Sequence, residues 1–315
     1  MGFGRFGAYH GCMPSRVLSF ARLLRLPNVF TAFADIALAG CATGFIVEEP
    51  LTILLLCLAS GSLYLAGMVW NDVFDRREDA ISQAFRPIPS GQVRTSTAVV
   101  LGIGLFILGG WLAALTYDPR GSMEGWLAPP FVAGLLMLAI LLYDGGLKRT
   151  PLGPVAMGLC RALNVLLGLS ASPSSLTNET LWLLPAVTGT YIIGVTWFAR
   201  TEEAESNRRQ LILASGVMAL ALALALVLRS RLPADSGTML FPYLLVGFGF
   251  FVGLPLARAV QNPGPKQVQT AIKRCVLGLV ALDAVLATAF VGLPGLAILL
   301  LLPPALLLGK WVYST

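Results

Sequence analysis

The sequence predicts an all-α membrane protein, a bundle of transmembrane helices, and three observations lead to this fold class. Of the 315 residues, 56% are hydrophobic and only 12% are charged, with a mean hydropathy of +0.78. That is too little charge for a soluble protein of this size. Apolar windows of about 20 residues, long enough to cross the hydrocarbon core as helix, recur along the chain. Basic residues gather in alternate connecting segments, as they do in polytopic membrane proteins.

Nine core transmembrane helices are expected, followed by a tenth apolar segment. The nine windows are residues 28–47, 51–71, 96–117, 126–143, 152–171, 181–199, 210–229, 238–259 and 271–292. The tenth, 294–309, is interrupted by Pro303-Pro304, so it either spans the membrane or forms a broken or interfacial segment. Residues 14–26 mix arginines with apolar residues and suit a short amphipathic helix on the membrane surface. We expect one integral membrane domain, 1–315, with its core at residues 20–292.

The distribution of positive charge predicts the orientation. If the N-terminus is cytoplasmic, the outward connections carry only Arg120, Arg229 and Arg231 of the 22 basic residues. This favours a multi-pass protein of the bacterial inner membrane or an equivalent membrane, with the N-terminus and the charged loops after the second, fourth and sixth spans on the cytoplasmic side. The net charge of +6 then reflects orientation, and no nucleic-acid partner is expected, because no connection is long enough to form a basic binding face. His10 is the only histidine, which leaves almost no material for zinc or histidine chemistry.

The run Asn71-Asp72-Val73-Phe74-Asp75-Arg76-Arg77-Glu78-Asp79, at the end of the second apolar stretch, is the strongest chemical signal. On a helix, Asp72, Asp75 and Asp79 fall within about 60° of arc, so their carboxylates can converge on one point. Mg²⁺ is usually held by one or two carboxylates together with waters and substrate phosphates. The run therefore predicts a magnesium and diphosphate site at the edge of the membrane.

A second acidic segment, 202–205, follows the sixth span on the same side of the membrane, and Lys148 and Arg149 lie between the two acidic segments along the chain. Two cation sites with basic residues between them suit the binding of an allylic diphosphate. When the bond between the allylic carbon and the diphosphate breaks, the main catalytic task is to stabilise the negative charge on the leaving diphosphate in a water-poor site. An apolar space between helices suits the isoprenoid tail. Pairing of the acidic segment 202–205 with Arg208 and Arg209 is an equally open interpretation.

The acidic run, followed by Arg86-Pro87-Ile88-Pro89-Ser90-Gly91, closely resembles the first aspartate-rich motif and its sequel in the UbiA family of intramembrane prenyltransferases. Leu26-Pro27-Asn28 resembles the family's opening asparagine region, and Tyr143 with Leu147-Lys148-Arg149 resembles its tyrosine and lysine loop. The resemblance covers residues 20–292. The segments 196–203 and 268–273 resemble the EboC-like branch of the family.

The resemblance implies a helical bundle around a central cavity, with Mg²⁺ and a prenyl diphosphate at its cytoplasmic mouth. It implies transfer of the prenyl group to a hydrophobic or aromatic acceptor within membrane lipid, with release of pyrophosphate. By matching position, the ligands of Mg²⁺ and diphosphate would be Asn71, Asp72, Asp75 and Asp79, the last three being the catalytic residues. Phosphate contacts would come from Arg86, Lys148 and Arg149, and the cavity lining from Asn28, Tyr143, Arg161 and Asn164.

The second motif departs from the family pattern. Two aspartates four residues apart are usual in the family, whereas this chain has Glu202 and Ser206 at these positions. Either Glu205 replaces the missing carboxylate, or the second metal ion is held weakly. This departure supports an alternative function, a catalytically weakened membrane carrier that binds a lipid or pigment precursor in the same pocket. Asp35 and Asp283 lie inside apolar spans, where charge is expensive, and either line the cavity or pair between helices.

Overall fold

The computed structural model describes residues 16–117, 128–200, 207–232 and 239–313, and within these ranges the chain is helical and contains no strand. The elements are α1 (Arg16–Leu23), η1 (Leu26–Asn28), α2 (Val29–Thr43), α3 (Phe45–Glu48), α4 (Pro50–Ser82), α5 (Thr95–Leu115), α6 (Pro129–Gly145), η3 (Leu147–Arg149), α7 (Gly153–Leu169), α8 (Pro173–Thr177), α9 (Leu183–Ala199), α10 (Arg208–Arg231), α11 (Phe241–Gln261), α12 (Pro265–Val291), η4 (Leu293–Leu301) and α13 (Leu302–Tyr313).

Every apolar window of the sequence corresponds to a helical segment, and the protein is an integral, multi-pass membrane protein. In the described ranges, seven segments are long and apolar enough to cross a membrane. Three further apolar helices, α6, α7 and α9, have 17 residues each. This is at the lower limit of about 17 residues for a transmembrane helix. The fold class is confirmed, whereas the count of nine crossings stays a prediction.

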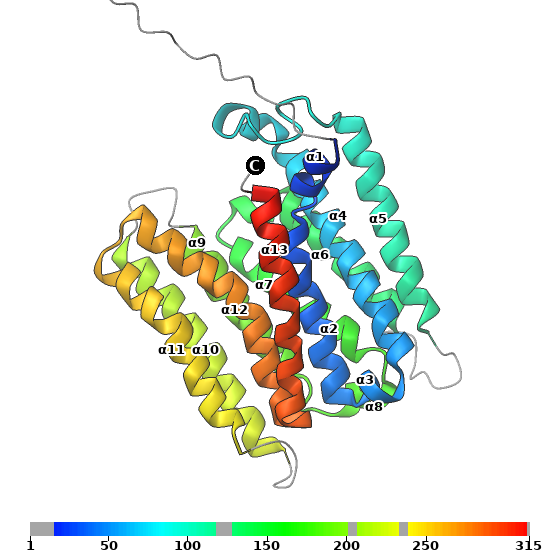
Figure 1. Ribbon diagram of the computed structural model, residues 1–315, viewed down its shortest axis with the longest axis vertical. Helices are drawn as coiled ribbons and strands as arrows, with labels where there is room; N and C mark the ends of the chain where they lie inside the picture. The colour runs from blue at the N-terminus through cyan, green and yellow to red at the C-terminus, as the bar shows by residue number, and fades with distance from the viewer. Residues whose placement is uncertain (1–15, 118–127, 201–206, 233–238, 314–315) are drawn as a thin grey trace, which may run out of the picture.

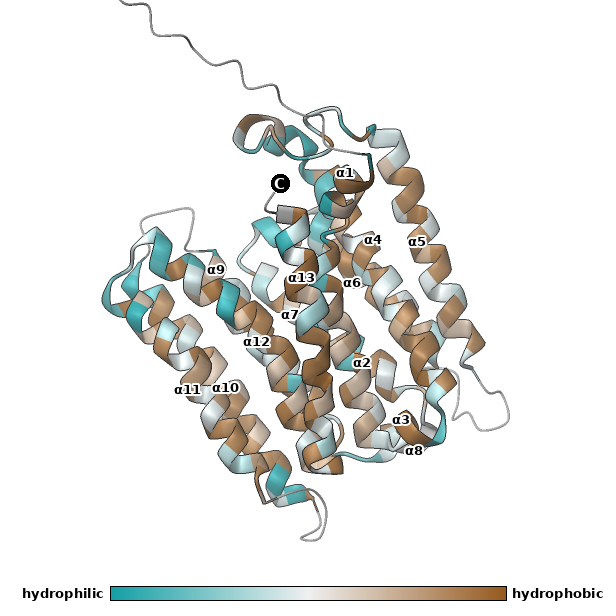
Figure 2. Cartoon of the chain, in the orientation of Figure 1, coloured by the Kyte–Doolittle hydropathy of each residue, from teal (hydrophilic) through white to brown (hydrophobic). Residues whose placement is uncertain are grey.

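The long helices pack in chain order into one bundle (Figure 1). From α4 to α12, each long helix contacts the next one along the chain, and α12 returns to contact α2, which also packs against α4 and α7. Apolar residues dominate the middle of the bundle, and hydrophilic residues gather towards its two ends (Figure 2). The apolar faces buried between helices form separate clusters, one centred on α9 to α12 and another on α4 to α7, and α2 and α7 contribute to both.

The tenth apolar segment is helical throughout and is one of the seven segments long and apolar enough to cross a membrane, so whether it spans stays open. It consists of a nine-residue 3₁₀ stretch, η4, followed by α13. Pro303 and Pro304 lie in the first turn of α13, where a missing N–H costs no helical hydrogen bond. The segment packs against α12 and α2, and α13 reaches η1 and α1. There Arg22 Nε donates a hydrogen bond to the carbonyl oxygen of Val312 at 3.0 Å.

Candidate active site

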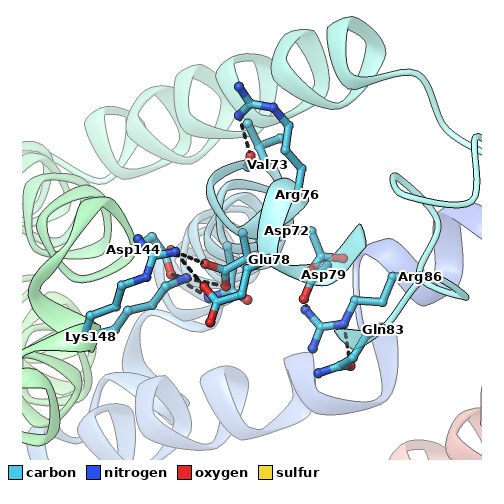
Figure 3. Close-up of polar contacts among 12 residues, drawn as sticks. Asp72, Val73, Arg76, Glu78, Asp79, Gln83, Arg86, Asp144 and Lys148 are labelled. Atoms are coloured by element: carbon cyan, nitrogen blue, oxygen red, sulfur yellow. Dashed lines mark hydrogen bonds and ion pairs between the residues drawn. The ribbon is translucent and has the colours of Figure 1, made fainter. Parts of the chain in front are cut away.

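Helix α4 carries the whole acidic run without a break. The apolar stretch ends near Asn71, but the helix continues for about three more turns to Ser82. Figure 3 shows that the acidic side chains leave α4 in two directions. Asp79 points to Arg86, whereas Glu78 lies on the side of Asp144 and Lys148. The mouth of the bundle therefore holds two groups of ion pairs.

The first group joins Asp72 and Asp79 to two arginines. Arg86 Nη1 lies 2.7 Å from Asp79 Oδ2 and 3.6 Å from Asp72 Oδ1. Arg25 Nη2 lies 3.1 Å from the same Asp72 oxygen. Both carboxylates are buried, and Gln83 Oε1 accepts a hydrogen bond from Arg86 Nε at 2.8 Å, which fixes the guanidinium in place. Arg86 thus binds two carboxylates of the acidic run.

The second group joins Asp75 to the basic loop η3. Lys148 Nζ lies 2.6 Å from Asp75 Oδ2 and 3.5 Å from Asp144 Oδ1. Arg149 Nη2 lies 2.9 Å from Asp75 Oδ1 and 3.1 Å from Glu78 Oε2, the latter at the exposed surface. Lys148 and Arg149, far from Asp75 in the sequence, therefore meet the acidic run in space, while their expected contact with phosphate stays a prediction.

Asn71 connects the two groups. Its Nδ2 donates to Asp144 Oδ1 at 2.7 Å, and its Oδ1 accepts from Arg25 Nη2 at 3.3 Å. Sequence reasoning missed Asp144 and Arg25 as site residues. The available signal was position: Asp144 is an acid beside Tyr143 at the end of a span, and Arg25 lies directly before the first span.

Arg25 also has an unusual backbone. Its φ of 47° and ψ of 45° are left-handed, and among the described residues it is the only non-glycine with positive φ. This conformation is costly for a residue with a Cβ. The turn between α1 and η1 holds the guanidinium over Asp72 and Asn71 at this cost.

The expected convergence of Asp72, Asp75 and Asp79 on one point is not what the structure shows. Among the described residues, no three His, Cys, Asp or Glu side chains are grouped so that they could hold a metal ion. The physical reason is that each carboxylate turns to its nearest cation, so Asp75 leaves the other two. Helical spacing fixes the direction of the Cβ atoms but not the side-chain rotamer.

The donor set nevertheless fits Mg²⁺ in its chemistry. Asn71, Asp72, Asp75 and Asp79 on α4, with Asp144 from α6, offer only carboxylate and amide oxygens, the hard donors that this ion prefers. Asp144 and Asp75 already share one cationic group, the Lys148 ammonium. The mouth is therefore suited to a cation accompanied by phosphate.

A cavity of about 450 Å³ runs from this mouth into the bundle. At the mouth it is lined by Arg25, Asn71, Tyr143 and Asp144, and its wall is mainly apolar, with residues such as Met68, Ile140, Val195 and Leu279. Further in, the lining becomes polar again at Thr31, Ser60, Arg161 and Asn164. Tyr143, Arg161 and Asn164 thus line the cavity as the family resemblance implied.

The remaining sequence-predicted residues lie elsewhere. Asn28 is not among the lining residues, although Thr31, one helical turn away, is. The Asn28 carbonyl accepts a hydrogen bond from Thr31 Oγ1 at 2.8 Å, so Asn28 ends the turn that starts α2. Glu202 and Glu205 lie outside the described residues. Arg200, which follows α9 and precedes this segment in the sequence, donates a hydrogen bond to the Lys148 carbonyl oxygen. The end of α9, the sixth predicted span, therefore lies beside η3.

Comparison with known proteins identifies the family. The profile of the UbiA prenyltransferase family matches residues 28–275. The chain belongs to this family. The match includes the acidic run, the Arg86 segment and the Lys148 loop, and it ends before η4 and α13.

Named relatives within the UbiA family fall into two groups. The chain is 31% identical over 156 residues to Digeranylgeranylglyceryl phosphate synthase of Saccharolobus solfataricus, covering 48% of this chain and 50% of that protein. It is 29% identical over 175 residues to Protoheme IX farnesyltransferase of Shouchella clausii, covering 54% and 51%. These alignments span about half the length of the relatives.

Solved structures share the fold over most of the chain. A structure described as giving insights into Digeranylgeranylglyceryl phosphate synthase in membranes aligns with a TM-score of 0.64 at 20% identity, covering 87% of this chain and 98% of that one. A UbiA homolog from Archaeoglobus fulgidus bound to GPP and Mg²⁺ aligns with a TM-score of 0.56 at 15% identity, covering 85% and 99%. At these identities the likeness concerns the fold.

Proposed function

We propose that this UbiA-family protein is an intramembrane prenyltransferase, which moves a prenyl group from a prenyl diphosphate to a hydrophobic or aromatic acceptor and releases pyrophosphate. The proposal rests on one observation. A mouth rich in carboxylates and basic groups opens directly into a mainly apolar cavity of about 450 Å³. A diphosphate with an isoprenoid tail has the same division between charged and apolar parts.

The basic groups of the mouth hold the diphosphate in this proposal. Lys148 and Arg149 on η3, and Arg25 and Arg86 on the opposite side of α4, can exchange part of their carboxylate contacts for phosphate oxygens. A second cavity of about 410 Å³ borders Asp72 and is lined by Arg22, Arg25 and Arg86, which gives phosphate oxygens further cationic neighbours. These groups stabilise negative charge that grows on the leaving diphosphate.

Asn71, Asp72, Asp75 and Asp79 are the residues we assign to Mg²⁺, with Glu202 and Glu205 as the proposed ligands of a second ion. Bound Mg²⁺ would neutralise phosphate charge and so favour departure of the diphosphate. The fit rests on the all-oxygen donor set described above. The A. fulgidus homolog bound to GPP and Mg²⁺ supports this assignment for a protein of the same fold.

The apolar wall of the cavity accepts the prenyl tail and excludes water. Exclusion of water matters because an allylic cation would otherwise be captured as an alcohol. The acceptor reaches the prenyl carbon from the cavity side, below Tyr143 and Asp144. For the named relatives, the products are a glyceryl phosphate lipid and a farnesylated haem; the acceptor of this chain is proposed only as hydrophobic or aromatic.

We place the mouth at the cytoplasmic side of the membrane. Arg22 on α1, Arg25 in the turn after it, and Lys148 and Arg149 on η3 all belong to this end of the bundle. A cytoplasmic mouth agrees with the positive-inside distribution and gives access to water-soluble diphosphate and Mg²⁺. We also propose a single domain, because the α12 and α2 helices pack together and close the bundle.

The testing experiment measures pyrophosphate release by protein purified in lipid, with Mg²⁺, geranyl, farnesyl and geranylgeranyl diphosphates and a panel of quinol, aromatic and lipid alcohol acceptors. Asp72→Asn keeps the side-chain shape but removes the charge that Arg25 and Arg86 contact. We expect turnover to fall about a hundredfold or more, since this charge acts on the reacting diphosphate site.

A matched control is Glu48→Gln on α3, an exposed acid outside the mouth. It is expected to leave turnover unchanged. Equal turnover of wild-type and Asp72→Asn protein would refute the site assignment. Mg²⁺-dependent binding of prenyl diphosphate without release, across the whole panel, would instead support the carrier function.

A further inference from the structure

Two acids lie beneath the polar inner end of the cavity. Asp35 on α2 and Asp283 on α12 are both fully buried. Each lies one helical turn beyond residues that line the cavity: Asp35 follows Ala32, and Asp283 follows Leu279. We call the group of Asp35, Asp283, Arg161, Asn164 and Ser60 the floor of the cavity.

Arg161 and Asn164 of α7 separate the two acids from the cavity. Asn164 Nδ2 donates to Asp35 Oδ2 at 2.7 Å and to the Ala32 carbonyl at 3.2 Å, while its Oδ1 accepts from Ser60 Oγ at 2.6 Å. Both N–H groups of the Asn164 amide are therefore used by the protein. Its role is to hold the floor together rather than to meet a ligand.

Arg161 has donors to spare. Its Nε lies 3.1 Å from Asp35 Oδ2 in an ion pair without hydrogen-bond geometry, and its Nη2 donates to the Thr31 carbonyl at 3.1 Å. Of the five N–H groups of a guanidinium, the described chain thus uses one, on Nη2, in a hydrogen bond, while Nε faces the Asp35 carboxylate. Because Arg161 also lines the cavity, the other donors are available on that side among the described residues. The N–H groups of Arg161 that face the cavity can be satisfied by an oxygen atom of a ligand.

The charges of the floor do not balance if both acids are ionised. Asp35 and Asp283 interact with each other and with one guanidinium, Arg161. Within the described chain, Asp35 Oδ1 and both oxygens of Asp283 have no hydrogen-bond partner. The hydroxyl of Tyr191, another titratable neighbour, donates instead to the Cys275 carbonyl. An unbalanced charge inside the bundle is expensive, and one proton held between the two acids removes it.

The floor lies opposite the mouth along the cavity. Ser60 at the floor and Asn71 at the mouth both line the cavity from α4, eleven residues apart, which corresponds to about 16 Å along a helix. Between them the wall is mainly apolar. A cavity that held only a hydrocarbon tail would be expected to end in apolar residues. A tail at the floor would leave the free N–H groups of Arg161 without a hydrogen-bond acceptor, which is costly. A molecule with polar groups at both ends suits this arrangement.

We propose that the floor is a second polar subsite, in which Arg161 binds a neutral oxygen, a carbonyl or hydroxyl, at the far end of the acceptor. A carboxylate or phosphate is disfavoured there, because the Asp35 and Asp283 pair lies directly behind Arg161. Asp35, Asp283 and Asn164 are positioning residues that hold Arg161 at the cavity. The proposal rests on the proposed function and specifies its acceptor as a molecule with two separated oxygens.

The test uses pairs of two-ring and three-ring phenols, each matched with an analogue that lacks the oxygen on the remote ring. Binding is read as the ligand-induced rise in melting temperature of the full protein in lipid, which requires no turnover. We expect each oxygenated member to bind wild-type protein about tenfold to a hundredfold more tightly than its analogue, as for a hydrogen bond to a charged group. Equal affinities within every pair would overturn the proposal.

The matching variants are Arg161→Gln and the double variant Arg161→Gln with Asp35→Asn. The double variant keeps the floor neutral, so it tests the site even if the single variant fails to fold. Either folded variant is expected to bind both members of a pair equally, with unchanged affinity for prenyl diphosphate. Arg274→Gln on α12, whose guanidinium lies 5.2 Å from the Phe251 ring, is the control arginine and should keep the preference.

Asp283 is tested by its conservative replacement. Asn has the shape of a protonated carboxyl group, so Asp283→Asn should keep the preference for the oxygenated phenol, whereas Asp283→Leu should reduce it. The infrared C=O band of a protonated carboxyl group should be present in wild-type protein and lost in Asp283→Asn. Loss of preference in Asp283→Asn, or an identical band in both proteins, contradicts the positioning role.

Failure of the prenyltransferase proposal gives a different result. In that case, pyrophosphate release is absent with every acceptor, while the binding preference of the floor can still be measured. If release occurs but the paired phenols bind equally, only the floor proposal is wrong.

Discussion

The mouth and the floor of the cavity use the same kinds of residues with different charge balance. At the mouth, the buried carboxylates of Asp72 and Asp79 and the partly buried Asp75 each have an arginine or lysine within 3.1 Å. At the floor, two fully buried acids share one arginine, and three of their carboxylate oxygens find no hydrogen-bond partner in the described part of the chain.

This difference teaches which site can rearrange. Mouth cations such as Arg149 are partly exposed to water. They can therefore exchange a carboxylate oxygen for another oxygen partner at little cost in free energy. The two acids of the floor are fully buried, so the loss of their cation leaves a buried charge that water cannot stabilise. The mouth is suited to binding and releasing charged ligands, and the floor is suited to holding a fixed geometry.

The sharpest test of this contrast is the stability of Arg161→Gln. The change leaves two buried acids without a cation, and we expect a loss of about 3–5 kcal/mol in unfolding free energy. Adding Asp35→Asn should restore part of it, because fewer charges then remain unpaired. Arg149→Gln at the mouth should cost less, since Asp75 keeps Lys148 at 2.6 Å and Arg149 is half exposed. Thermal or denaturant unfolding in detergent measures all three. Equal losses at the two sites would contradict the comparison.

Ligand stabilisation should occur at the mouth. With Mg²⁺ and prenyl diphosphate at a hundred times their dissociation constant, we expect about 2.7 kcal/mol of added stability. Chelation of Mg²⁺ by EDTA should remove this gain, and Asp72→Asn should never show it. Melting curves with and without each ligand measure the effect. A gain that survives EDTA would exclude a role for the metal in diphosphate binding.

Lys148→Met should affect catalysis more than folding. Asp75 keeps its contact with Arg149 at 2.9 Å, so little change in melting temperature is expected. Loss of a charged donor to phosphate should lower turnover about tenfold and weaken prenyl diphosphate binding. Steady-state kinetics gives both values. If the melting temperature falls sharply while kcat/KM stays constant, Lys148 is a structural residue.

The smallest expected effect is at Ser60. Ser60→Ala removes the hydrogen bond to Asn164 Oδ1 and should cost about 1 kcal/mol of stability. Ser62→Ala is the matched control on the same helix, because Ser62 Oγ only donates to the Leu58 carbonyl one turn back. A larger loss for Ser62→Ala than for Ser60→Ala would argue against the floor as a connected network.

Much of the fold could be predicted from the sequence because hydropathy reports membrane crossing directly. The apolar windows all correspond to helical segments, and in the tenth window Pro303 and Pro304 lie in the first turn of α13, directly after η4. The helix boundaries were less certain, since α4 continues through the charged run to Ser82. A polar run can stay helical outside the membrane core, so loss of hydropathy does not mark the end of a helix.

The site could be predicted where residues lie close in sequence and less well where helices meet. The acidic run and the Lys148 loop were found from their motifs, and the structure brings them together, with Lys148 Nζ 2.6 Å from Asp75 Oδ2. Asp144 and Arg25 were missed, because their importance comes from packing beside Asn71. For Asp35 and Asp283 the sequence left two options, and the structure favours pairing between α2 and α12.

Arg25 has a consequence for protein engineering. Its left-handed backbone would suit glycine, and a design that optimised stability alone would make that change to relieve the strain. The same change would delete the guanidinium that contacts Asp72 and Asn71. Position 25 therefore carries a trade-off between stability and activity, and a consensus-style or thermostabilised variant should leave it untouched.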